Sequence, residues 1–196
     1  YTINPTGTGY GNTIDVRTQP ISLKRYWVGD SGDWNDTNHW SITSGGIGGF
    51  SVPGELNDVY FDENSFPNDS TGIVNIDISV FLNCLVYDNC KEITINVFRS
   101  LTCIESCTIE NNLTTINGLF ILNNNAIWYG EGTISEFYCY PNTFIYGNNY
   151  FLSLILDTDE EPIATFSFER DTNQRIDMLN VINTSSTSQA IITVLT

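Results

Sequence analysis

Residues 26–66 read YWVGDSGDWNDTNHWSITSGGIGGFSVPGELNDVYFDENSF, and this stretch decides the fold. Its many Gly, Asn and Asp residues favour turns and left-handed backbone angles, so no helix is expected here. Three of the four tryptophans also lie in it, and large rings need a common surface on which to bury. The stretch therefore predicts a compact cap of turns and short strands over residues 26–68. The aromatic residues expected to close this cap are Trp27, Trp34, Trp40, Tyr60 and Phe61.

The chain after the cap alternates apolar and polar residues in short segments, as half-buried strands do. Matching apolar positions recur at about twenty residues, with Ile76, Ile95 and Ile116 spaced 19 and 21 apart. Such a period is typical of one coil of a parallel β-solenoid, in which each coil buries its inward face on the next. We predict an all-β fold, a right-handed parallel β-solenoid with an N-terminal aromatic cap. A β-sandwich is the alternative, because it also has many short strands.

Three regions follow from this pattern. Residues 1–25 are rich in Thr, Gly and Pro and predict an extended N-terminal arm or linker. Residues 26–68 form the cap, whose glycines between Gly45 and Gly49 predict a mobile surface loop. Residues 69–196 form the solenoid coils. The chain begins at Tyr1 and ends in a strand-like run, so we expect the coils to continue in a longer parent polypeptide.

Charge and composition exclude several classes of partner. The 196 residues contain 23 acidic and 7 basic side chains, a net charge of −16. An acidic surface repels nucleic acids and anionic membranes, so neither is an expected partner. No run of about twenty apolar residues is present, so membrane insertion is not expected.

The five cysteines are Cys84, Cys90, Cys103, Cys107 and Cys139. The favoured interpretation is that they are small buried hydrophobic side chains. One or two disulfides, or a four-thiolate zinc site built from the first four, are the alternatives, although the spacing lacks the usual zinc knuckle.

The cap carries a motif that resembles a known group of proteins. The motif comprises Tyr26-Trp27-Val28-Gly29, Gly32, Trp34, Asp36, His39-Trp40-Ser41, Val52-Pro53 and Asp58-Val59-Tyr60-Phe61-Asp62. It resembles a recurrent motif that opens a β-solenoid in phage virion proteins and in large surface proteins of environmental bacteria. Asp30 and Asp33 depart from it, since Gly and Asn are commoner there. The resemblance implies a structural role, carries no catalytic residue, and implies a homotrimer or contacts with other virion proteins.

Two candidate sites lie within the cap. Asp30, Asp33 and Asp36 recur every three residues in a Gly-containing loop, and calcium takes oxygen ligands from such loops. The favoured alternative is that these side chains cap turns without binding metal. No cofactor is therefore expected, and calcium binding is the alternative to test. His39 is the single histidine and is interpreted as structural, because no nucleophile motif accompanies it.

Candidate enzymatic and sugar-binding residues lie in the coils. Asp157, Asp159, Glu160 and Glu161 form an acidic cluster, and paired carboxylates hydrolyse glycosides when held at set distances. A solvated turn is the favoured interpretation of this cluster. A lyase could use an arginine as its base or to hold a charged substrate, and the candidates are Arg99, Arg170 and Arg175. No second motif in the sequence supports a lyase. The favoured interpretation of the aromatic residues in or near coil turns is that they fill the core or contact another chain. Those that face outward would stack on sugars. The residues concerned are Trp128, Tyr129, Tyr138, Tyr140, Tyr146 and Tyr150.

The sequence therefore predicts a non-enzymatic structural or attachment protein. The resemblance favours a segment of a phage fibre or spike in the virion that contacts host-surface glycan. A solenoid polysaccharide depolymerase and a bacterial adhesin at the cell surface are the alternatives.

Overall fold

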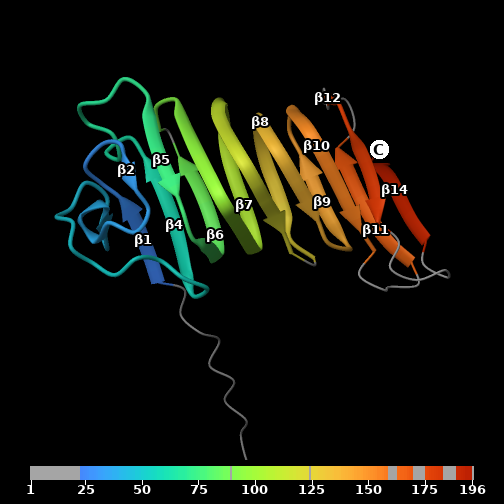
Figure 1. Ribbon diagram of the computed structural model, residues 1–196, viewed down its shortest axis with the longest axis horizontal. Coiled ribbons are helices and arrows are strands. Elements are labelled where there is room, and N and C mark those ends of the chain that lie inside the picture. The colour runs from blue at the N-terminus through green and yellow to red at the C-terminus, as the bar shows by residue number, and fades with distance from the viewer. Residues whose placement is uncertain are drawn as a thin grey trace, which may run out of the picture.

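A computed structural model describes residues 23–88, 90–123, 125–158, 163–169, 175–182 and 189–195. Apart from a three-residue 3-10 helix, all regular structure in these ranges is β-strand (Figure 1). The elements are β1 (Leu23–Trp27), β2 (Gly32–Asp33), η1 (Thr37–His39), β3 (Trp40–Ser41), β4 (Asn57–Asp62), β5 (Gly72–Ile76), β6 (Ser79–Asp88), β7 (Ile93–Leu122), β8 (Ile127–Cys139), β9 (Thr143–Tyr146), β10 (Asn149–Asp157), β11 (Ile163–Glu169), β12 (Arg175–Ile176), β13 (Leu179–Ile182) and β14 (Gln189–Leu195).

The strands stack side by side along a rod, from β1 at one end to β14 at the other (Figure 1). Each pairing between successive coils is parallel, and only the short β1–β3 pair among the described strands is antiparallel. The predicted parallel β-solenoid is thus confirmed, and the sandwich alternative is wrong. The long strand β7 winds through more than one coil, because it pairs with β5, with β6 and with β8.

The register confirms the period expected from the sequence but corrects one pairing. Ile95 lies opposite Val74 rather than opposite Ile76, and Ile76 lies opposite Val97. The two registers differ by two residues, so both keep the same side chains on the core face. The apolar side chains of this pair are all buried there: Val74, Ile76, Ile95 and Val97.

Aromatic side chains stack along the core from coil to coil. The Phe120 and Phe137 rings lie 5.6 Å apart and nearly parallel, and Phe151 continues the stack at 4.9 Å from Phe137. The Trp128 ring packs edge-on against the first two and donates a hydrogen bond to Asn149 Oδ1 at 3.0 Å. Rings that stack on successive coils bury apolar area in the narrow interior.

Amides form a second ladder on the outside. The Asn96 amide donates to Asn75 Oδ1 at 3.0 Å, and the Asn117 amide donates to Asn96 Oδ1 at 3.0 Å. Asn75 in turn donates to Asp33 Oδ1 at 3.1 Å. The residues of this ladder lie on strands β2, β5 and β7.

The N-terminal end buries its tryptophans completely. The expected burial of Trp34 and Trp40 is confirmed, since both side chains and that of Trp27 are 0% exposed. The Trp40 and Trp34 rings lie 4.6 Å apart, and Trp40 Nε1 donates to the Trp34 carbonyl at 2.7 Å. Phe61 is also buried, whereas Tyr60 is half-exposed on the outer surface.

Two details of this end differ from expectation. Residues 23–25 of the expected arm already belong to β1, which pairs with β4, and residues 1–22 lie outside the described residues. The glycine loop expected to be mobile lies at the surface as predicted, but it makes close contacts with η1 at one end. A Cβ on Gly48 would lie 1.7 Å from the Asn38 carbonyl oxygen, and the Gly49 N–H donates to the Thr37 carbonyl at 2.9 Å.

Candidate functional site

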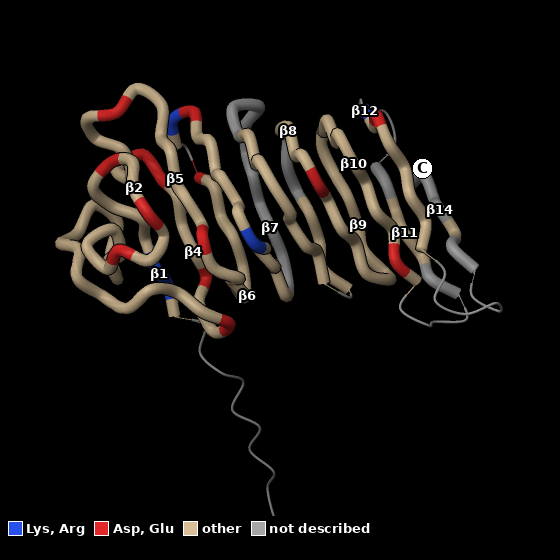
Figure 2. The backbone as a smooth tube through the Cα atoms, in the orientation of Figure 1, with Lys and Arg blue, Asp and Glu red and all other residues tan. Residues whose placement is uncertain are grey.

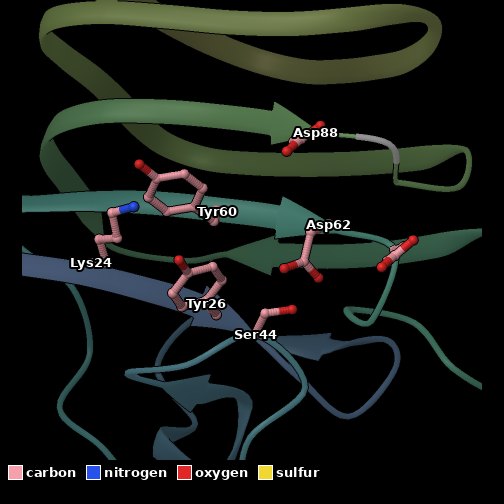
Figure 3. A pocket seen from close by; sticks show the side chains of 7 residues that line it. Lys24, Tyr26, Ser44, Tyr60, Asp62 and Asp88 are labelled. Atoms are coloured by element: carbon pink, nitrogen blue, oxygen red, sulfur yellow. The ribbon is translucent and has the colours of Figure 1, made fainter.

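An open groove of about 400 Å³ runs along the outer face of the first coils. Strands β1, β4 and β6 build its floor, because β1 pairs with β4 and β4 with β6. Alternation along β4 buries Val59 and Phe61 and turns Tyr60 and Asp62 outward into the groove (Figure 3). The lining residues are Lys24, Tyr26, Ser44, Tyr60, Asp62, Glu63 and Asp88.

A pair of tyrosines forms one wall. Tyr26 on β1 lies directly opposite Tyr60 on β4, and their rings stack with centroids 5.0 Å apart at an angle of 25°. Both rings are half-exposed, so the pair presents apolar surface and two hydroxyl groups to the groove. Lys24 reaches the same wall, with Nζ 4.9 Å from the centre of the Tyr60 ring (Figure 3).

Carboxylates form the opposite wall. Asp62 at the end of β4 lies opposite Asp88 at the end of β6, and Glu63 follows Asp62 in the turn. Like charges on neighbouring strands repel each other, which favours a partner that brings donors or positive charge. Asp62 is held in place by the N–H of Asn64, which donates to its Oδ1 at 2.9 Å. The Asn64 amide also donates to Ser44 Oγ at 2.9 Å, and this bond holds the loop at the edge of the groove.

Two groups in the groove have a shifted pKa. Interaction with Tyr60, and next with Tyr26, raises the pKa of Lys24, so its ammonium group stays charged. Burial raises the pKa of Tyr60, so its phenol stays protonated and can donate one hydrogen bond to a ligand. One ammonium, two phenols and three carboxyl groups therefore offer both donors and acceptors to a ligand.

This arrangement suits a sugar better than a small apolar molecule. An aromatic wall supplies apolar contact, and carboxylates accept hydrogen bonds from several hydroxyl or amino groups at once. An open groove bordered by polar residues also admits one unit of a long polymer from outside. An acidic sugar would meet three carboxyl groups and is disfavoured.

The structure does not bring the predicted calcium residues together. Asp30 accepts from the Asn68 N–H at 2.7 Å and from the Asn68 side-chain amide at 2.8 Å, and this side-chain hydrogen bond chiefly lowers its pKa. Asp33 accepts from Asn75, and Asp36 accepts from the Asn38 N–H at 2.9 Å as the cap of η1. Within the described ranges no group of three acidic, His or Cys side chains is arranged to hold a metal ion.

The predicted catalytic candidates are dispersed. His39 is structural in its contacts: its ring stacks on Trp27 at 4.5 Å and Nδ1 lies 2.8 Å from the Val28 carbonyl oxygen. The prediction that Asp157 lies in a solvated turn is wrong. Asp157 ends β10, is buried, and accepts a hydrogen bond from the Tyr138 hydroxyl. The rest of that acidic cluster lies outside the described residues: Asp159, Glu160 and Glu161.

The three arginines do not share a site either. Arg99 is exposed on β7. Arg175 lies over the Tyr150 ring at 4.4 Å and pairs with Asp177 at 3.4 Å. Arg170 lies outside the described residues.

The aromatic residues proposed for sugar stacking divide into two groups. Trp128 is wholly buried in the core, as the favoured interpretation predicts, so it cannot stack on a sugar. Four tyrosines are half-buried at the surface, and Tyr138 and Tyr140 pack on each other at 5.2 Å. The half-buried tyrosines are Tyr138, Tyr140, Tyr146 and Tyr150. The side chain of Tyr129 lies outside the described part of the structure.

The described cysteines include both buried thiols and a disulfide-bonded residue. Cys90 and Cys139 are buried thiols, as the favoured interpretation predicts, and burial raises the pKa of Cys90 to about 11. Cys84 is a half-buried thiol. Cys103 is disulfide-bonded, so it cannot serve as one of four zinc thiolates.

Sequence reasoning missed the groove as a site. It singled out Tyr60 only as part of the cap, and it did not connect Tyr26 with Tyr60 or Asp62 with Asp88. Alternation in Asp58 to Asp62 could have shown that Tyr60 and Asp62 share a face. The pairings with other coils depend on loop lengths that the sequence period does not supply.

Comparison of the chain with protein-family models, with curated proteins and with solved structures finds no match. In the part of the chain that the structure describes, no helix is long and apolar enough to cross a membrane.

Proposed function

We propose that this chain is a non-enzymatic attachment rod, a segment of a phage fibre or spike that contacts host-surface glycan through the groove beside Tyr26 and Tyr60. The observation that carries the proposal is the groove itself, in which a stacked tyrosine pair faces three carboxyl groups on a rigid parallel sheet. The assignment to a virion rests on the resemblance of the cap motif.

The solenoid supports a role at a distance from an anchor. Stacked coils extend the molecule in one direction, and the amide and aromatic ladders link each coil to the next. Side chains on such a scaffold keep fixed spacing, which lowers the entropy cost of binding a glycan. Acidic residues gather around the first coils (Figure 2), where they discourage binding to polyanions.

The groove indicates a ligand class. Neutral sugars and sugars with a free amino group fit its charge, because the ammonium of an amino sugar would lie between facing carboxylates. Uronic and sialic acids are expected to bind weakly.

A binding assay with matched variants tests the proposal. We expect the protein to bind immobilised neutral and amine-bearing glycans, and Tyr60→Ala to weaken both by about tenfold or more, which is roughly 1.4 kcal/mol. Tyr150→Ala is the control, because this half-buried tyrosine packs with Arg175 on a different pair of strands. Equal binding by wild type and Tyr60→Ala would refute the groove as the site.

A depolymerase is the second candidate, favoured by one observation, the buried carboxylate of Asp157 beside the Tyr138 hydroxyl. It is tested by incubating the protein with the bound glycans and measuring new reducing ends or unsaturated products. Sustained product formation that Asp157→Asn abolishes would replace the attachment proposal with this one.

A further inference from the structure

In the amide ladder on the outer face, the last residue, Asn117, is bonded differently from Asn75 and Asn96. Asn75 and Asn96 are each bonded on both sides, since each donates to the previous rung and accepts from the next. Asn117 donates to Asn96, and among the described residues no donor reaches its own Oδ1. Its side chain is also exposed, whereas Asn75 and Asn96 are half-buried.

The residue after each rung also differs. Asn75 is followed by Ile76, and Asn96 is followed by Val97; both side chains are buried in the core. Each is branched at Cβ and hinders attack by its own backbone nitrogen on the preceding Asn side chain. Asn117 is followed by Gly118, and this is the single Asn-Gly pair in the chain. Glycine offers no side chain to hinder attack by its own backbone nitrogen.

The backbone is irregular at this point. The pairing of β7 with β8 shifts between Ile116 and Leu119, so Asn117 and Gly118 together lie opposite one residue of β8. Such a bulge interrupts the ladder and leaves a residue without regular pairing. Gly118 has a φ of +118°, a conformation that residues with a side chain rarely adopt.

We propose that Asn117 is a site of spontaneous deamidation, with water as the co-reactant. The backbone nitrogen of Gly118 attacks Cγ of Asn117 and forms a five-membered imide. The Cγ–Nδ2 bond breaks, and ammonia leaves with the proton lost by the Gly118 nitrogen. Water then opens the ring at either carbonyl carbon and yields aspartate or isoaspartate, without any redox change.

The modification acts on the ladder. The product carboxylate can no longer donate to Asn96 Oδ1, and at neutral pH it places a negative charge beside that acceptor. One inter-coil bond is lost, and one more charge is added to a chain already at −16. The intact bond to Asn96 also restrains Asn117, so the ladder slows the reaction that breaks it.

The test follows the three amides in the intact folded protein. The chain is incubated in mildly alkaline buffer and digested, and aspartate and isoaspartate are quantified at each rung by mass spectrometry. We expect Asn117 to convert several-fold faster than Asn75 and Asn96, and Asn117→Gln to abolish the isoaspartate signal in that peptide. Asn96→Ala, used only if its circular dichroism spectrum is native, should speed the conversion.

Equal rates at the three rungs, or conversion of Asn117 only in denaturant, would overturn the proposal. Gly118→Ala is unsuitable as a control, because its Cβ would lie 2.0 Å from the Val97 carbonyl oxygen. Asn117→Asp serves to test the consequence, and a melting temperature equal to that of the wild type would contradict the stated effect on the ladder.

Discussion

Replacing Trp34 tests how the first coils are held together. Its side chain is wholly buried, against Trp27 at 6.5 Å and Trp40 at 4.6 Å between ring centres. Trp34→Ala should cost roughly 3–5 kcal/mol in the free energy of unfolding, the usual range for truncating a buried large aromatic residue. Its indole N–H has no hydrogen-bond partner among the described residues. Trp34→Phe removes this unsatisfied donor as well as ring area, so we expect a smaller cost of about 1–2 kcal/mol.

Trp40 provides the matched comparison. Its indole N–H donates to the Trp34 carbonyl at 2.7 Å, so Trp40→Phe leaves a buried acceptor unpaired. This adds roughly 1–3 kcal/mol to the loss of ring area. Urea unfolding followed by far-ultraviolet circular dichroism measures the three variants. The reasoning predicts that Trp34→Ala costs most and Trp34→Phe least, and it is refuted if Trp34→Phe costs as much as Trp40→Phe.

Three further predictions concern metal and pH. A chelator should leave the melting temperature unchanged, because Asp30 already accepts hydrogen bonds from Asn68; a clear drop would restore the calcium interpretation. Asn68→Ala should destabilise the protein at neutral pH and have a smaller effect in acid. The pKa of Asp30 is lowered in the folded protein, so its carboxylate contributes stability at pH values above its unfolded pKa of about 3.9. This stability is lost as the pH falls through the folded pKa. A cost of Asn68→Ala that does not change with pH would contradict the role of the Asn68–Asp30 hydrogen bonds. Alkylation of Cys90 in the native protein should be slow near neutral pH and accelerate toward its pKa of about 11; rapid labelling at neutral pH would show that the thiol is not buried.

The sequence carried enough information for the architecture. The period of about twenty residues seen in the sequence matches the register between β5 and β7, although Ile95 lies opposite Val74 and not Ile76. Burial of Trp34 and Trp40 was also predictable, because large apolar rings in a segment rich in turns need a common surface on which to bury. These features depend on local alternation and on a regular period, both of which are visible in one sequence.

The candidate site could not be predicted in the same way. Tyr26 pairs with Tyr60, and Asp62 pairs with Asp88, across loops that are longer in these first coils than between Val74 and Ile95. The register across such loops is fixed by which side chains reach the core, and a sequence period does not contain it. The burial of Asp157 was missed for a related reason, since its partner Tyr138 comes from the preceding coil.

The most direct test of the central proposal is to locate the chain on its parent particle. Antibodies raised against the folded protein would be coupled to gold and applied to virions and to bacterial cells from the same culture, then viewed by electron microscopy. The attachment proposal predicts gold along an appendage of the virion. Gold confined to the bacterial cell surface would contradict it and identify the chain as part of an adhesin.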